Sequence, residues 1–254
     1  MSGIRLYQFP VSHYCEKVRW ALDYKGLGYQ AVNMIPGLHM KKMKKLSGRT
    51  SVPLLLHNDQ LLSGSANIIS YLDQQFPEHL LTPTEAQLQQ QALSWEQRLD
   101  QQAGVDVRLW CYHHLLQRPE QMTALLAAGR PIYWRWLLKG IYPKLNDGMR
   151  HGMNINADSA AAAERRMQAT LSDLRAAYSQ SHFLVGERLS RADITACSLF
   201  AMLFQPKEYG VRWPRPAQLP EAMRHWLEDN DTLLEPLRLR YAQYRPVRHI
   251  KTGG

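Results

Sequence analysis

The pattern of the sequence changes once along the chain, near Phe76-Pro77, and this change limits the available folds. Before it, short β-type runs alternate with segments of helical periodicity, as is typical of a compact α/β unit. After it, strand signals disappear and long stretches rich in Gln, Leu and Ala carry apolar residues at helical spacing. The chain of 254 residues is long enough for two domains with separate cores. We therefore expect an α/β domain at residues 1–80, a helical domain at 86–243 and a flexible basic tail at 244–254.

Within the first eighty residues, the β-type and helical signals follow a definite order. A basic segment, residues 40–45, is expected to connect the second strand to a hairpin that turns at Asn58-Asp59. The expected elements are, in order, a strand at 4–8, a helix that starts near Tyr14 and is stopped by Gly26 and Gly28, a strand at 29–33, a hairpin of residues 51–56 and 61–62, and a helix at 65–76. The resulting order is β-α-β followed by β-β-α.

Cysteine usage, hydropathy and charge limit the cofactors, the cellular location and the binding partners that we expect. The three cysteines, Cys15, Cys111 and Cys197, show neither CxxC nor Cys/His spacing, which predicts no disulfide framework and no metal site, and favours a cytoplasmic location. No apolar run approaches the ~20 residues that cross a bilayer, and the start lacks an export signal, so no membrane association is expected. The net charge of +9 suits anionic ligands, and no recognition helix, aromatic RNA-binding motif or Arg/Gly repeat points to nucleic acid.

Four motifs in order along the chain resemble those of glutathione transferases. Residues 12–22, Ser-His-Tyr-Cys-Glu-Lys-Val-Arg-Trp-Ala-Leu, resemble the family's first strand-to-helix motif, in a domain shared with thioredoxin and glutaredoxin. Ser51-Val52-Pro53 is similar to the family's Val-Pro with a cis proline, Gly64-Ser65 stands where an acidic residue or Gln usually precedes Ser, and residues 190–193 resemble the family's helical capping box. Residues 100–160 carry no matching motif. The resemblance implies a thioredoxin-like β-α-β-β-β-α domain followed by a helical bundle, and a homodimer.

The resemblance also implies glutathione as the co-substrate. The N-terminus of a helix stabilises an anion such as a thiolate, and residues 12–15 occupy that position. Main-chain atoms of Val52, in the extended Val52-Pro53 dipeptide, are implied to bind the cysteinyl moiety. Gly64-Ser65 would hold the γ-glutamyl carboxylate, although Gly64 lacks the family's side-chain contact with the amino group. The basic residues expected to pair with the glycyl carboxylate are His39, Lys41 and Lys42.

The side chain that faces the glutathione sulfur decides the chemistry. Ser12 occupies the position of the first Cys of a glutaredoxin-like CxxC motif, and Cys15 that of the second, which is commonly shielded. A hydroxyl at Ser12 favours thiolate stabilisation, so Ser12 ranks first and Cys15 second. Helix capping, with Glu16 closing a capping box, is the structural alternative for Ser12. The remaining candidates are the hydroxyls of Tyr7 and Tyr14, the latter also a candidate for the core, and His13 for proton transfer.

The helical half carries aromatic residues and one strong capping signal. In this family the electrophile pocket lies in the helical domain next to the thiol. Residues expected to line it are Trp110, Tyr112, Trp134 and Trp136, with ordinary helical packing as the alternative. Ser190 and Asp193 form a capping box ahead of an apolar stripe that includes Cys197, so we interpret them as folding determinants.

The first functional hypothesis is a glutathione transferase that acts on a small hydrophobic electrophile, as in detoxification, or on a peroxide, with Ser12 stabilising the thiolate. The second is thiol–disulfide or deglutathionylation chemistry through Cys15. The third is a non-catalytic binding or regulatory protein, which Gly64 and the unmatched residues 100–160 favour.

Overall fold

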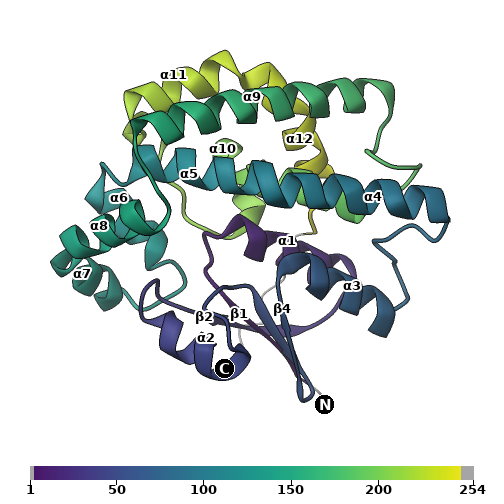
Figure 1. Cartoon of the computed structure of the whole chain (residues 1–254), viewed down its shortest axis with the longest axis horizontal. Coiled ribbons are helices and arrows are strands. Elements are labelled where there is room, and N and C mark those ends of the chain that lie inside the picture. The colour runs from purple at the N-terminus through teal and green to yellow at the C-terminus, as the bar shows by residue number, and fades with distance from the viewer. Residues whose placement is uncertain (1–2, 247–254) are drawn as a thin grey trace.

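The computed structural model describes residues 3–246 of the chain. Four strands form one mixed sheet in the order β2-β1-β3-β4 (Figure 1). The strands are β1 (Ile4–Gln8), β2 (Tyr29–Asn33), β3 (Leu54–His57) and β4 (Gln60–Ser63). β1 pairs in parallel with β2 and antiparallel with β3, and β3 and β4 form the antiparallel hairpin. The bounds predicted for the first two strands are confirmed, and the predicted hairpin is present.

Helices cover both faces of this sheet because residues alternate between its faces along each strand. Leu6 of β1 belongs to the main core together with α1 (His13–Tyr24) and α3 (Ser65–Gln75), whereas the next residue, Tyr7, packs on Met43 of α2 (His39–Ser47). The basic segment that was expected to be a connection is therefore helical. Met43 is the buried residue of α2, and the four lysines of this helix are exposed. The predicted thioredoxin-like domain is confirmed, with α2 as an additional helix.

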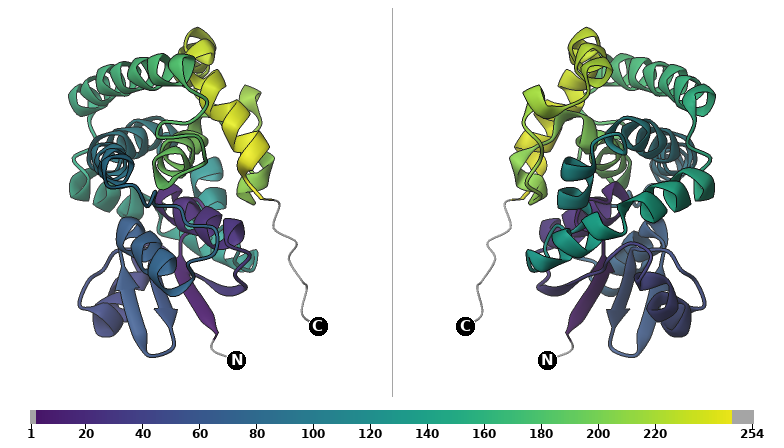
Figure 2. Two further views of the ribbon diagram at one scale, coloured as in Figure 1. Left: turned by 90° about the vertical axis from the view of Figure 1, so that its right-hand side faces the viewer. Right: turned by 90° about the vertical axis from the view of Figure 1, so that its left-hand side faces the viewer.

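The second half of the described chain is helical, as predicted, and lies on the α1 side of the sheet (Figure 2). Its helices are α4 (Ala86–Arg98), the π-helical segment η1 (Leu99–Ala103), α5 (Gly104–Leu115), α6 (Pro119–Leu126), α7 (Tyr133–Gly140), α8 (Tyr142–Gly152), α9 (Ala157–Gln180), α10 (Arg191–Phe204), α11 (Glu221–Asp229) and α12 (Asp231–Tyr244), with 3₁₀ turns at Lys207–Tyr209 and Pro216–Gln218. Within residues 3–246, no helix has the length and apolar character required to cross a membrane.

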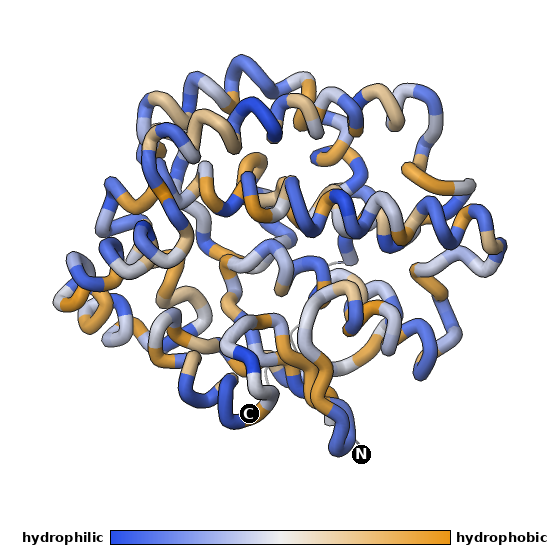
Figure 3. The backbone as a smooth tube through the Cα atoms, in the orientation of Figure 1, coloured by the Kyte–Doolittle hydropathy of each residue, from blue (hydrophilic) through white to orange (hydrophobic). Residues whose placement is uncertain are grey.

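Helix α10 lies at the centre of this half, with every residue from Arg191 to Leu203 buried. Ser190 and Asp193 form the predicted capping box at its start, and Cys197 is buried within it. The outer helices are amphipathic. In α4, for example, polar and apolar residues alternate along the helix (Figure 3). Because the outer helices bury one face against the central helix, their apolar residues recur at helical spacing, and this spacing can be recognised in the sequence.

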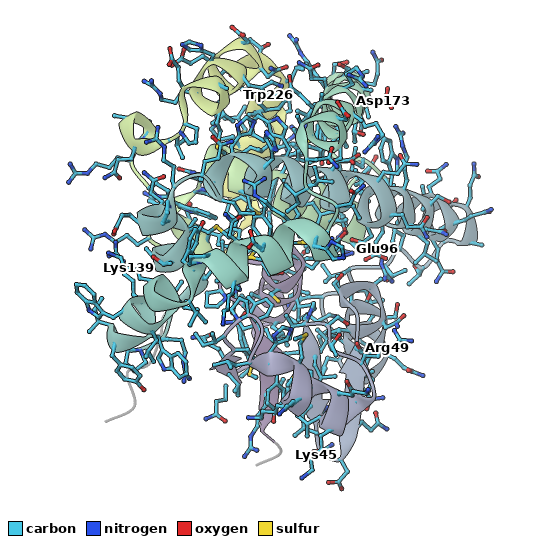
Figure 4. The ribbon with its side chains drawn as sticks, turned by 60° about the vertical axis from the view of Figure 1, so that its left-hand side comes forward. Lys45, Arg49, Glu96, Lys139, Asp173 and Trp226 are labelled. Carbon is cyan, nitrogen blue, oxygen red and sulfur yellow. The ribbon has the colours of Figure 1, made fainter. Side chains whose placement is uncertain are left out.

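Buried ion pairs join the two halves. Lys17 Nζ of α1 lies 2.8 Å from Glu96 Oε1 of α4 and 2.7 Å from Asp100 Oδ2 of η1. Arg191 lies 2.5 Å from the other oxygen of Glu96 and donates to the Ala66 carbonyl of α3 at 2.9 Å. Glu96 lies in the interior where the halves meet (Figure 4). These charges hold the start of α1 in a fixed position against η1.

Glu16 does not close a capping box with Ser12. Its buried carboxylate accepts hydrogen bonds from Tyr241 and Arg245, each at 2.6 Å, and from Arg19. Burial opposes ionisation of Glu16, but Arg245 and Arg19 lower its pKa below the usual value. Arg245, expected in a flexible tail, is therefore a buried partner of α1, and α12 extends to Tyr244. The remainder of the predicted tail, 247–254, lies outside the described residues.

Candidate active site

Two adjoining cavities lie where the α/β half meets the helical half. The large cavity, about 940 Å³, is bounded by residues 9–14, the connection between β2 and α2, and helices α5, α7 and α8. The small cavity, about 230 Å³, is bounded by Pro53, the start of α3 and Asp100. Tyr14 and Val52 line both cavities. A ligand of peptide length bound along Val52 can therefore occupy one cavity and reach into the other.

Ser12 lies at the wall of the large cavity, as the N-cap residue of α1. Its extended backbone begins the helix, and its Oγ accepts a hydrogen bond from the Cys15 N–H at 3.4 Å. The hydroxyl proton takes no part in this bond, so the Ser12 hydroxyl can still donate to an anion in the cavity. The unpaired N–H groups of the first turn of α1 add a partial positive charge there.

Cys15 is enclosed in the protein, with a relative exposure of 0%, and lines neither cavity. Burial raises the pKa of its thiol, and the hydrogen bond with Ser12 and the charge of Arg19 offset this only in part. The thiolate is the nucleophilic form of cysteine, so both observations weigh against attack by Cys15. Burial likewise raises the pKa of the Cys111 and Cys197 thiols.

His13 and Tyr14 attach the start of α1 to the helical half. The His13 Nε2–H donates to the Gly104 carbonyl at 2.8 Å, and the Tyr14 hydroxyl donates to the Asp100 carbonyl at 2.5 Å. Burial, assisted by the positive charge of Arg108, lowers the pKa of His13 to about 3, and burial raises the pKa of Tyr14 to about 12. Both side chains are therefore neutral near pH 7. A Cβ at Gly104 would lie only 2.3 Å from the Tyr14 hydroxyl oxygen, so glycine permits this contact.

Three other predicted residues of the thioredoxin-like half, Tyr7, Lys41 and Lys42, line neither cavity. Tyr7 faces α2, with Lys42 Nζ 5.3 Å from its ring centroid, and lines neither cavity, because residues 6 and 7 point to opposite faces of the sheet. Lys41 and Lys42 are exposed on α2 and line neither cavity. His39, at the start of α2, does line the large cavity and packs edge-on against Phe9. Burial lowers the pKa of His39.

The small cavity is built from the predicted binding motifs. The Val52-Pro53 peptide bond is cis, as the family motif predicts, and the Pro53 carbonyl accepts a hydrogen bond from the Gly64 N–H at 3.3 Å. Gly64 has φ +90°, a value that side chains disfavour, and it precedes Ser65, the first residue of α3. Asp100 faces this helix start across the small cavity. Its position could not be inferred from the sequence, because no motif marks residues 100–160.

Two of the four predicted aromatic residues line the large cavity, namely Tyr112 and Trp134. Trp110 does not: its indole N–H donates to Glu164 at 2.9 Å, and its ring packs on Trp226. Trp136 is 67% exposed and is also absent from the cavity wall. Helical geometry gives the reason in both cases, because residues two apart differ in direction by about 200°.

Arg108 is a cavity residue that the sequence analysis missed. It lies on α5 four residues after Gly104 and four before Tyr112, so the three share one helix face. The spacing of four residues from Tyr112, which was already a candidate for the electrophile pocket, could have identified Arg108 from the sequence. Arg108 therefore places a guanidinium close to the start of α1, where its charge acts on His13 and Tyr14.

The fold and site together define a class of protein: a thioredoxin-like domain with a cis proline and a helix N-terminus at the cavity, completed by a helical domain. Residues 6–80 match the model of the glutathione S-transferase N-terminal domain, and residues 122–228 match that of the C-terminal domain. The chain belongs to the glutathione S-transferase family.

Individual relatives agree with this assignment. The chain is 32% identical to glutathione S-transferase 1 of Dianthus caryophyllus over 145 residues, which cover 48% of this chain and 65% of that protein. It is 26% identical over 212 residues to the tetrachloro-p-hydroquinone reductive dehalogenase of Sphingobium chlorophenolicum, covering 80% and 84% of the two chains. A solved glutathione S-transferase from Rhodospirillum rubrum superposes with a TM-score of 0.65 at 19% identity, covering 98% of this chain and 94% of that one, which supports the fold.

Proposed function

We propose that this chain is a glutathione-dependent transferase that binds glutathione across the small cavity and along Val52. The thiol of the bound glutathione would then face a hydrophobic electrophile, or a peroxide, in the large cavity. The observation that supports this most directly is the junction of the two cavities. Tyr14 and Val52 line both, and Ser12 at the N-terminus of α1 lines the large one. The predicted peptide-binding and thiol-activating features therefore converge on one place.

Backbone groups supply most of the proposed glutathione contacts. The residue before a proline is held extended, so the main chain of Val52 can pair with the cysteinyl moiety as a strand would. The first turn of α3 offers N–H groups without intrahelical partners to the γ-glutamyl carboxylate, with the Ser65 hydroxyl beside them. His39 and the exposed Lys41 and Lys42 are proposed for the glycyl end. His39 is the one of these that lines a cavity.

Asp100 is proposed to replace the side chain that Gly64 lacks. Its carboxylate lines the small cavity, retains 18% side-chain exposure and forms an ion pair through Oδ2 with Lys17. Burial raises the pKa of Asp100, and Lys17 partly offsets this rise. An ammonium group bound beside Asp100 would favour the ionised carboxylate further. The amino group of the γ-glutamyl moiety thus finds an acidic partner from η1 rather than from position 64.

Ser12 is proposed to stabilise the thiolate of bound glutathione. The hydroxyl donates to the sulfur, and the partial positive charge of the α1 N-terminus adds to this stabilisation. The thiol proton leaves to solvent, because burial lowers the pKa of His13 to about 3 and makes it a weak base, and the Tyr14 hydroxyl already donates to a carbonyl group. The sulfur then forms the bond to the electrophile. The burial of Cys15 favours this hydroxyl mechanism over the Cys15-dependent alternative.

Isothermal titration with glutathione, followed by a conjugation assay with a chloronitrobenzene acceptor, tests the proposal. We expect binding at millimolar ligand or below, and turnover that falls in Ser12→Ala but persists in Cys15→Ser. Absence of glutathione binding would refute the proposal. Binding without conjugation or peroxide reduction would support the non-catalytic alternative. Full dependence of turnover on Cys15 would support the thiol–disulfide alternative.

We also propose that the protein acts as a homodimer in the cytoplasm; membership of the family supports the dimer, and the cysteine usage supports the location. Size-exclusion chromatography with light scattering tests the dimer. A monomeric mass at working concentration would contradict it.

A further inference from the structure

Arg108 has no hydrogen bond or ion pair with any residue in the described range 3–246, although it is half-buried in the wall of the large cavity. Most buried or half-buried cations nearby do have partners: Lys17 is paired with Glu96 and Asp100, and Arg19 with Glu16. A partly desolvated guanidinium without a counter-ion is unfavourable unless a ligand supplies the anion. Arg108 can therefore bind an anionic group inside the cavity.

The remaining charge in the cavity wall is also positive. Lys144 of α8 is the second cation among the lining residues, and none of the lining residues is an Asp or Glu. The other lining side chains are mostly apolar, among them Trp134, Leu138 and Met149. The nearest carboxylate on α5, Asp106, is engaged by Arg166 at 2.6 Å. The wall thus combines a large apolar surface with unopposed positive charge.

Arg108 also lies at the end of the cavity beside the start of α1, where it can orient an acceptor. Its charge acts on His13 and Tyr14 of α1 and on Tyr112 one turn along α5, so it lies close to the proposed thiol position beside Ser12. A guanidinium binds a carboxylate in a bidentate fork, which fixes orientation as well as position. An acceptor held in this way would present its ring to the apolar wall.

We infer that the large cavity selects apolar aromatic acceptors that carry an acidic group, a carboxylate or a phenolate, and that Arg108 binds this group. The inference rests on the proposed transferase function. For a haloarene acceptor, the glutathione thiolate forms a carbon–sulfur bond, the carbon–halogen bond breaks, and the halide leaves with its electron pair. The thiol proton has already passed to solvent.

A matched pair of acceptors tests this inference: para-chloro-meta-nitrobenzoate and the corresponding benzamide, which share ring and leaving group. Each enzymatic kcat/KM is divided by the uncatalysed rate, which removes the difference in intrinsic reactivity. We expect the wild-type protein to favour the benzoate, and Arg108→Gln to raise KM for the benzoate about tenfold or more while changing the benzamide less than about twofold. Arg175→Gln on the exposed face of α9 removes the same net charge and should change neither.

The alternative role for Arg108 is to stabilise the glutathione thiolate. In that case Arg108→Gln would slow both acceptors equally and shift the pH dependence of turnover, and this result would overturn the inference. An equal preference for the two acceptors in the wild type would do so as well, while leaving the transferase function intact. If neither acceptor is turned over and no peroxide is reduced, the proposed catalytic function fails instead. Calorimetric binding of the benzoate and the benzamide to wild-type and Arg108→Gln protein still tests the anion site, because it requires no turnover.

Discussion

Replacing Ser12 with alanine tests the proposed role of its hydroxyl. The substitution removes a donor to the thiolate of bound glutathione and an N-cap acceptor for the Cys15 N–H. A hydrogen bond to a charged group contributes about 1.5–3 kcal/mol. At 1.36 kcal/mol per pKa unit, its loss raises the pKa of the bound thiol by about 1–2 units. Loss of the cap separately lowers the free energy of unfolding by about 1 kcal/mol.

The effect on rate is smaller than the effect on ionisation. Below both pKa values, the thiolate fraction falls about tenfold to a hundredfold, but a less acidic thiol gives a more nucleophilic thiolate, with a Brønsted slope of about 0.4–0.5. The two effects combine to a loss of roughly 3- to 15-fold in conjugation rate. The loss should shrink at a pH above the raised pKa, where both proteins hold thiolate.

Ultraviolet absorbance of the bound thiolate as a function of pH measures the pKa directly, and conjugation across the same pH range measures the rate. Ser12→Thr keeps both the hydroxyl and the cap and should behave like the wild type. Ser190→Ala removes a distant cap, on α10, and serves as the stability control. An unchanged thiol pKa in Ser12→Ala would refute the reasoning, whatever happens to stability.

Further predictions concern the residues around Ser12. Cys15→Ser should keep conjugation within about twofold, because its buried thiol has a raised pKa and is not the expected nucleophile; a tenfold loss would contradict this. Gly104→Ala should lower the free energy of unfolding by about 1–3 kcal/mol in denaturant titration, and Tyr14→Phe should partly restore it, because the added Cβ meets the tyrosine hydroxyl. Folding stability should decline as pH falls from 6.5 towards 3, because the unfolded state protonates His13 first, and His13→Gln should flatten this part of the profile of melting temperature against pH. Asp100→Asn should raise KM for glutathione about tenfold with little change in kcat, and an unchanged KM would argue against its contact with the amino group.

Much of the fold was predictable because its signals are local. The strands at 4–8 and 29–33 and the capping box at Ser190 depend on neighbouring residues, and the structure reproduces them. Helix α2 was missed because Met43 is its only buried residue, and the six residues 40–45 cannot show an apolar stripe around a single contact. The pairing of Arg245 with Glu16 joins residues 229 positions apart, a separation that no local pattern reports. The domain bounds of 1–80 and 86–243 remain predictions.

The site was predictable mainly where a motif marked it, although the predicted His39, Tyr112 and Trp134 also line the large cavity. Ser12 and the Val52-Pro53 bond came from motifs, and the structure places both at the cavities. The directions of Tyr7 and Trp110 depend on which face of a strand or helix meets the cavity, and residue type alone does not determine this. Asp100 lies in the unmatched region, where its carboxylate reaches the small cavity from the π-helical segment.

A crystal structure with glutathione bound tests the central claim most directly, through the atom nearest the sulfur. We predict that the Ser12 hydroxyl oxygen lies within hydrogen-bonding distance of that sulfur, with the γ-glutamyl group in the small cavity at Gly64-Ser65. A sulfur bonded to Cys15, or glutathione bound away from Ser12, would contradict the account.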